Sequence, residues 1–158
     1  MKNTARIFFL VIAIFVFPGF ATAQTTDKPN SQYDAELAKK LGADDMGMRQ
    51  YVLVILKTGP TRMPDGKKRT EMFAGHFANM NRLADEGKLV LAGPLDGVDG
   101  WRGLFVLAVS DIEEAKKLVA TDPVIMKGEM MAEYHKWYGS AGVMEVNSIH
   151  RKVAKKNL

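Results

Sequence analysis

An amphipathic helix that ends at a glycine and leads directly into a short apolar strand is the most constraining feature of this chain. Thr70 is a plausible N-cap, and apolar side chains recur at helical spacing up to residue 86. Gly87 supplies the residue type that commonly ends a helix in the left-handed conformation. Residues 88–95 then form the predicted strand, which ends at Gly93 and Pro94. The other elements are organised around this helix–turn–strand unit.

Three further strands and a second long helix complete the pattern. The predicted strands are residues 51–57, 101–109 and 129–138, and the second helix covers residues 110–120. Asp122 can cap a short additional helix in which Pro123 is the first residue. The order β-α-β-β-α-β predicts an α+β, ferredoxin-like fold, in which two helices cover one face of a four-stranded antiparallel sheet.

One face of such a sheet has no helix over it, and the predicted strands are too apolar to leave that face in water. A second copy of the chain would cover the face most simply. The sequence therefore predicts a homodimer whose sheets pack face to face.

The N-terminus has the pattern of a secretory signal peptide over residues 1–23. Lys2 and Arg6 precede an apolar run at 7–17, and Ala21 and Ala23 form a small-residue cleavage site. An uncleaved membrane anchor is the alternative, but the run is shorter than the roughly 20 residues that span a bilayer. We expect a periplasmic or secreted mature protein with no membrane association after cleavage. The chain has no cysteine, so its folded domain lacks disulfides.

The rest of the chain divides into a polar linker at 24–48, a folded domain at 49–140 and a basic tail at 141–158. The linker contains a short helix that ends at Gly42. Loss of Lys2 and Arg6 with the signal peptide lowers the net charge from +4 to +2. Because the remaining excess is mostly in the tail and no basic stripe alternates with aromatic residues, nucleic acid is not an expected partner.

His76 is the strongest candidate for chemistry. It lies on the apolar face of the first long helix, where each ring nitrogen needs a partner. Antiparallel topology can bring Asp122 close to it from the far end of the second helix. A carboxylate on one nitrogen would fix the tautomer and leave the other nitrogen to move a proton. The alternatives are a core histidine with satisfied hydrogen bonds and an aspartate that only caps a helix.

Gly93, Pro94 and Arg102 are the candidate substrate-binding residues. A glycine at the strand end permits close approach of a ligand, although an ordinary hairpin exit has the same sequence. Arg102 begins the third strand and can bind an anion, or it can be a solvated strand end. No metal is expected, because His76, His135 and His150 are far apart and no cysteine accompanies them.

Residues 51–138 resemble the YCII-related family, small proteins of the dimeric α/β-barrel group. The resemblance rests on an ordered set of motifs. They are His76, then LADEGKL at 83–89, LAGPL at 91–95, EEA at 113–115, TDP at 121–123 and Gly128. The resemblance implies a ferredoxin-like dimer with a His–Asp pair at its active site, which by position is His76 and Asp122. One branch of the family is associated with dehydrochlorination of a chlorinated hydroxyquinone, and related barrels include muconolactone isomerases.

The resemblance and the placement of His76 together predict a cofactor-free acid–base enzyme of the lyase or isomerase type, acting on a small organic molecule. A second hypothesis is a non-catalytic module that binds a small molecule in the same pocket. Haem is a third, weaker hypothesis for the ligand, since other dimeric α/β barrels use a helix histidine as an axial ligand.

Overall fold

The computed structural model of the protein describes residues 30–156. The chain divides into two units, residues 1–33 and residues 34–158, and the helices and strands of the described residues lie in the second unit. The signal peptide predicted at 1–23 lies outside the described residues and stays a prediction. Within residues 30–156, no helix is both long enough and apolar enough to cross a membrane.

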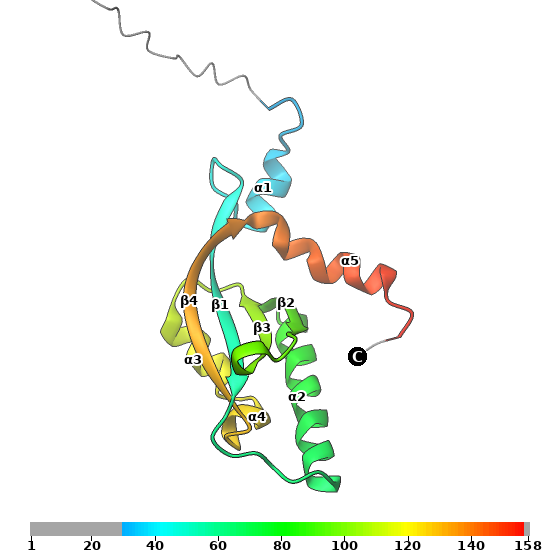
Figure 1. The fold of residues 1–158 in the computed structure, drawn as a ribbon. Helices are drawn as coiled ribbons and strands as arrows, with labels where there is room; N and C mark the ends of the chain where they lie inside the picture. Colours follow the sequence, from blue (N-terminus) through cyan, green and yellow to red (C-terminus); the bar gives the residue numbers. More distant parts are fainter. Residues whose placement is uncertain (1–29, 157–158) are drawn as a thin grey trace, which may run out of the picture. The chain divides into compact units, whose positions relative to one another are not determined.

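The centre of the fold is a four-stranded antiparallel sheet with the order β2-β3-β1-β4 (Figure 1). Its strands are β1 (Met48–Thr58), β2 (Leu89–Pro94), β3 (Trp101–Leu107) and β4 (Met130–Ser140). The two long strands, β1 and β4, pair along their whole length. The predicted α+β, ferredoxin-like fold is therefore confirmed, and the strands differ from their predicted bounds only at their ends.

Three helices pack on one face of the sheet. They are α2 (Lys67–Asp85), α3 (Ile112–Val119) and the short α4 (Pro123–Met126), while the 3-10 turn η1 (Val98–Gly100) joins β2 to β3. Alternate side chains of β1 point toward these helices, since successive residues of a strand face opposite sides. Val52 and Val54 thus lie in one core with Leu83 of α2 and Val119 of α3.

The helix ends follow the sequence signals with one exception. Gly87 adopts φ 69°, and the N–H groups of Gly87 and Lys88 bond back to carbonyls of the last turn of α2, as expected for a glycine stop. The prediction of Thr70 as N-cap is wrong, because α2 begins three residues earlier, after Gly66. The Thr70 hydroxyl instead donates to the Gly66 carbonyl, 3.2 Å away, from within the helix.

Both ends of the unit carry helices beyond this core. The predicted short helix is α1 (Ala35–Leu41), with Asp34 as its cap and Gly42 in the left-handed conformation. The segment predicted as a tail forms η2 (Ala141–Glu145) and α5 (Val146–Val153), and α5 leads away from the end of β4 (Figure 1). A salt bridge of 2.9 Å between Lys40 and Glu145 links α1 to η2.

The second face of the sheet is covered only in part. Tyr51 and Val106 point to this face and are buried there, and Val143 and Met144 of η2 pack against them. Leu91, on the edge strand, stays exposed. The chain therefore covers one end of the second face with its own C-terminal segment.

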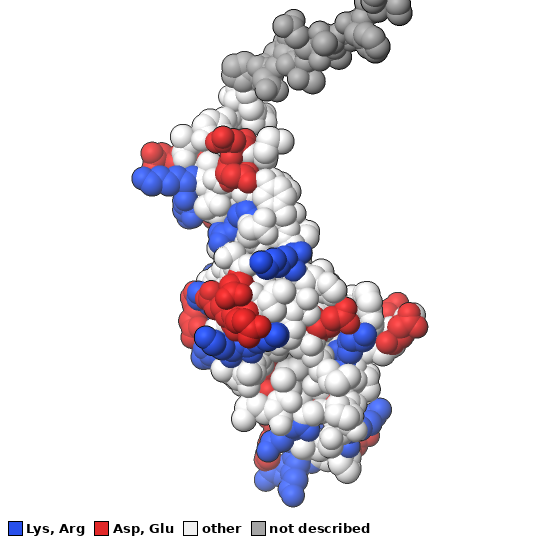
Figure 2. Space-filling view, turned by 90° about the vertical axis from the view of Figure 1, so that its left-hand side faces the viewer, with Lys and Arg blue, Asp and Glu red and all other residues white. Residues whose placement is uncertain are grey.

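The charges on the surface are mixed in sign. Figure 2 shows acidic and basic side chains side by side over the face that it presents, with no continuous stripe of either sign. Charged residues at the protein surface form several ion pairs, such as Arg82–Glu86 at 2.7 Å and Lys88–Glu114 at 2.8 Å. Such exposed pairs contribute little to stability.

Candidate active site

His76 lies on the buried side of α2, within an aromatic environment. The imidazole packs against Phe73 and Phe77 of the same helix and stacks on Phe105 of β3, with ring centroids 5.4–6.1 Å apart. Phe73 lies three positions before His76, a spacing at which helix side chains are neighbours, and Phe77 directly follows it. The side chain keeps 9% of its surface exposed.

The Nδ1 atom of His76 lies 2.7 Å from Oδ2 of Asp122, which is a strong hydrogen bond between two buried side chains. Asp122 is 1% exposed, and its other oxygen, Oδ1, accepts from the backbone N–H of Val124 at 3.1 Å. The carboxylate thus caps α4 and holds the imidazole at the same time. The structure brings these two predicted residues together, while their chemical role stays a prediction.

Local sequence explains why the two residues meet. Asp122 caps α4 and Pro123 occupies its first turn, as the sequence predicts. Gly75, next to His76 on α2, faces Pro123 so closely that an added Cβ would lie 3.0 Å from the proline Cγ. The absence of a side chain at Gly75 therefore lets α4 approach α2 and places Asp122 within reach of His76.

The arrangement leaves one imidazole nitrogen available. Within residues 30–156 no group forms a hydrogen bond with Nε2 of His76. A neutral imidazole that donates from Nδ1 to Asp122 carries a lone pair on Nε2. Such an imidazole can take a proton from a bound molecule, and the carboxylate then stabilises the imidazolium.

The three other predicted site residues do not join this pair. Ala92 pairs with Phe105 across the sheet and shares the helix-covered core, so the next residue, Gly93, faces the opposite side. Pro94 is exposed at the strand end, and Arg102 is half-buried. Among the described residues, no hydrogen bond or ion pair links Arg102 to His76 or Asp122. A substrate-binding role for Gly93, Pro94 and Arg102 stays a prediction.

A second buried pair lies near the first and was missed in the sequence. Arg69 of α2 donates to Glu129 at 2.7 Å, with side chains 20% and 1% exposed. Glu129 also accepts from the backbone N–H of Met63 at 2.7 Å. Burial alone would raise the pKa of Glu129, but the bonds from Arg69 and Met63 and the charge of Arg102 hold it below its usual value. The hydrogen bond between Arg69 and Glu129 also raises the pKa of Arg69.

An open groove of about 490 Å³ runs along α2, and its lining includes the two phenylalanines that contact the His76 ring but not His76 itself. Arg69, Phe73 and Phe77 line it, and Phe77 is 44% exposed. The Arg69 guanidinium lies 4.8 Å from the centroid of the Phe73 ring, a cation–π contact. These three residues recur at a spacing of four, which is the signal that could have identified this stripe.

The protein is thus a small α+β domain in which the carboxylate of Asp122 orients the imidazole of His76. The family with the description YCII-related domain matches residues 48–137, which include every strand position up to Trp137 and both members of the pair. The chain belongs to the YCII-related domain family.

Two known proteins are similar to this chain. The uncharacterized protein YjpA of Bacillus subtilis (strain 168) is 31% identical over 90 residues, which is 57% of this chain and 95% of YjpA. A solved structure of 5-chloro-2-hydroxyhydroquinone dehydrochlorinase (TftG) from Burkholderia phenoliruptrix AC1100, in complex with 2,5-dihydroxybenzoquinone, is 20% identical. The match covers 55% of this chain and 92% of that one, with a TM-score of 0.42. A likeness of this degree says nothing about the reaction of this chain.

Proposed function

We propose that this protein is a small cofactor-free acid–base enzyme of the lyase or isomerase type. His76 transfers the proton, and Asp122 orients the imidazole. The observation that carries the proposal is the 2.7 Å hydrogen bond from Nδ1 of His76 to a carboxylate that is itself fixed by a helix cap. A core histidine needs partners only for its own stability. Here the hydrogen bond to Asp122 satisfies one nitrogen and leaves Nε2 without a described partner.

The proposed reaction begins with removal of a proton by Nε2 of His76. The electron pair of the broken bond forms a new double bond in the substrate. In a lyase, the leaving group departs with its own bonding pair, and the imidazolium then gives its proton to that group or to water. In an isomerase, the imidazolium returns the proton at another carbon. Asp122 keeps its hydrogen bond to Nδ1 and stabilises the imidazolium, and release of the proton from Nε2 returns the pair to its initial state.

The proposed binding place for the substrate is the groove on α2 that Arg69, Phe73 and Phe77 line. The exposed ring of Phe77 offers an apolar surface, and Arg69 offers a positive charge at the same groove. This combination favours a small flat organic molecule with an anionic or hydroxyl group.

A homodimer is part of the proposal. The second sheet face includes Leu53 and Leu104, which are only partly buried, and a second sheet is a suitable cover. Size-exclusion chromatography with light scattering on the mature protein should give twice the chain mass. A monomer at micromolar concentration would contradict the dimer.

Export is proposed from residues 1–23, as a signal peptide that is removed after Ala23. Expression of the full chain in a Gram-negative host, followed by N-terminal sequencing, should give a mature protein that starts at Gln24 in the periplasmic or secreted fraction. A full-length protein in the cytoplasmic fraction would contradict this part of the proposal.

The test of the proposed pair is the tautomer of His76, measured by ¹⁵N NMR of the ring nitrogens. In the wild type, the neutral ring should carry its proton on Nδ1. In Asp122→Asn, the one remaining oxygen is needed for the Val124 N–H, so the amide NH₂ faces Nδ1 and the proton should move to Nε2. A wild-type ring protonated on Nε2 would contradict the proposal.

A further inference from the structure

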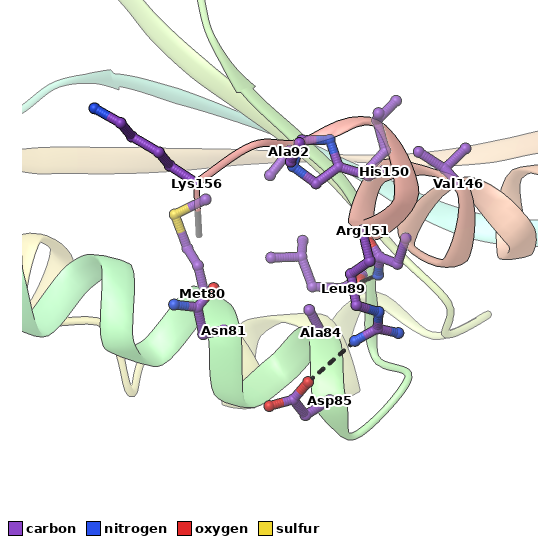
Figure 3. Close-up of a pocket in the computed structure, with 13 residues that line it drawn as sticks. Met80, Asn81, Ala84, Asp85, Leu89, Ala92, Val146, His150, Arg151 and Lys156 are labelled. Carbon is purple, nitrogen blue, oxygen red and sulfur yellow. Dashed lines mark hydrogen bonds and ion pairs between the residues drawn. The ribbon is translucent and has the colours of Figure 1, made fainter. Parts of the chain in front are cut away.

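A second cavity, of about 430 Å³, lies between α2, the edge strand β2 and the C-terminal helix α5 (Figure 3). Its volume is in the range of roughly 300–1,000 Å³ that is typical of small-molecule sites. Apolar side chains form most of its wall: Met80, Ala84, Leu89, Leu91, Ala92 and Val146. His76 and Asp122 do not line it.

The cavity exists because the chain continues beyond the part that matches the family. That part ends at residue 137, and α5 begins at Val146. The Asn147 side chain donates to the Leu89 carbonyl at 2.7 Å and so fixes α5 to the start of β2. One turn later, Arg151 meets Asp85 of α2 at 3.4 Å (Figure 3). These two contacts hold α5 across the edge of the sheet and close one side of the cavity.

The charged groups around the cavity are mainly basic. Among its lining residues within 30–156, His150, Arg151 and Lys156 are basic and Asp85 is acidic. The Arg151–Asp85 contact is long and both side chains are exposed. A guanidinium has five N–H donors, so Arg151 can bind a carboxylate in two-pronged geometry while it stays near Asp85.

We propose that this cavity is a binding site for a small organic acid, with an apolar body against Met80 and Leu89 and a carboxylate at Arg151. The site goes beyond the proposed acid–base function and does not use its residues. It gives the C-terminal segment, which lies outside the family match, a function of its own.

The experiment measures binding of octanoate to the mature protein by isothermal titration calorimetry, with 1-octanol as the uncharged probe of equal length. Octanoate should bind at least tenfold more tightly than 1-octanol. Ala84→Phe fills the cavity and should weaken octanoate binding at least tenfold, whereas Ala78→Phe, at an exposed position of the same helix outside the cavity, should not.

A second pair of variants tests the charge without changing the wall of the cavity. Arg151→Gln should bring octanoate affinity close to that of 1-octanol, and the neighbouring Lys152→Gln, which does not line the cavity, should leave it unchanged. His76→Asn should also leave octanoate binding unchanged, so failure of the acid–base proposal would not affect this test.

Three results would overturn the proposal. They are no detectable binding of octanoate at millimolar concentration, equal affinities for octanoate and 1-octanol, or the same affinity in Arg151→Gln as in the wild type. If Ala84→Phe does not fold by circular dichroism, the Arg151 and Lys152 pair decides the outcome.

Discussion

Two hydrogen-bonded pairs with buried carboxylates connect α2 to the chain around α4, and they have the same length but different chemistry. Arg69 meets Glu129 at 2.7 Å, just after α4, and His76 meets Asp122 at 2.7 Å, just before it. Both carboxylates are 1% exposed, and both also accept a backbone N–H. Distance and burial therefore do not distinguish a structural pair from a reactive one.

The basic group distinguishes them. A guanidinium does not give up its proton at any physiological pH, so the Arg69–Glu129 pair cannot transfer a proton. An imidazole exchanges its proton near neutrality, and His76 has a second nitrogen with no described partner. We therefore expect loss of the first pair to affect stability, and loss of the second to affect chemistry.

The largest expected effect is on turnover. On a substrate identified by screening the purified protein, His76→Gln should lower kcat by about 10²- to 10⁴-fold, the usual contribution of a general acid or base. The exposed His135→Gln is the matched control and should keep wild-type turnover. Wild-type turnover in His76→Gln would contradict the proposed role of His76 in proton transfer.

The next effect is on stability. Glu129→Gln removes the buried carboxylate from Arg69, which keeps the exposed Asp65 as its remaining partner at 3.3 Å. The loss of the charged hydrogen bond should lower the free energy of unfolding by about 2 kcal/mol, measured with urea. Glu133→Gln removes a half-exposed carboxylate paired with Lys57 and should cost far less. His76→Gln should also cost less than Glu129→Gln, and equal losses would show that both pairs are structural.

The pH dependence of stability should report on the first pair. Because the folded-state pKa of Glu129 lies below its ordinary value of 4.5, its contribution is complete above that value and is lost as the pH falls through the folded pKa. The stability difference between wild type and Glu129→Gln should therefore shrink as the pH is lowered from 5. A difference that is constant with pH would mean that ionisation of Glu129 does not stabilise the fold.

The smallest effect concerns how α4 is positioned. Gly75→Ala gains helix propensity of about 1 kcal/mol, but its Cβ would crowd Pro123, and overpacking costs about 1–3 kcal/mol. We expect a net loss of about 1 kcal/mol and a smaller population of the Nδ1–H tautomer of His76. Gly93→Ala meets no atom within 4 Å and should be near neutral by the same urea and NMR measurements. A stabilised Gly75→Ala with an unchanged tautomer would contradict this account.

The sequence predicted much of the frame because its signals are local. Gly87 ends α2, Asp122 caps α4 and Gly42 ends α1, each through hydrogen bonds to residues a few positions away. The error at Thr70 has a local cause as well. Its hydroxyl can bond either ahead as a cap or back to the Gly66 carbonyl, and the residue type does not decide between them.

The candidate site was less predictable. His76 and Asp122 stood out because each is a polar residue at an apolar or capping position, and the structure brings them together. Arg69 and Glu129 did not stand out, because an arginine in a helix and a glutamate before a strand are usually solvated. Their burial depends on contacts between distant parts of the chain, since Glu129 bonds to Arg69, 60 residues earlier, and to the N–H of Met63, 66 residues earlier.

The sequence by itself determined the order of strands and helices, the helix ends and the family, since these depend on periodicity, caps and short motifs. Only the tertiary structure decided which side of the sheet each site residue faces. It placed Gly93 opposite His76, and it folded the C-terminal segment over β2 to enclose a second cavity. The physical reason is that burial and cavities come from contacts between residues distant in the chain, which local propensity does not encode.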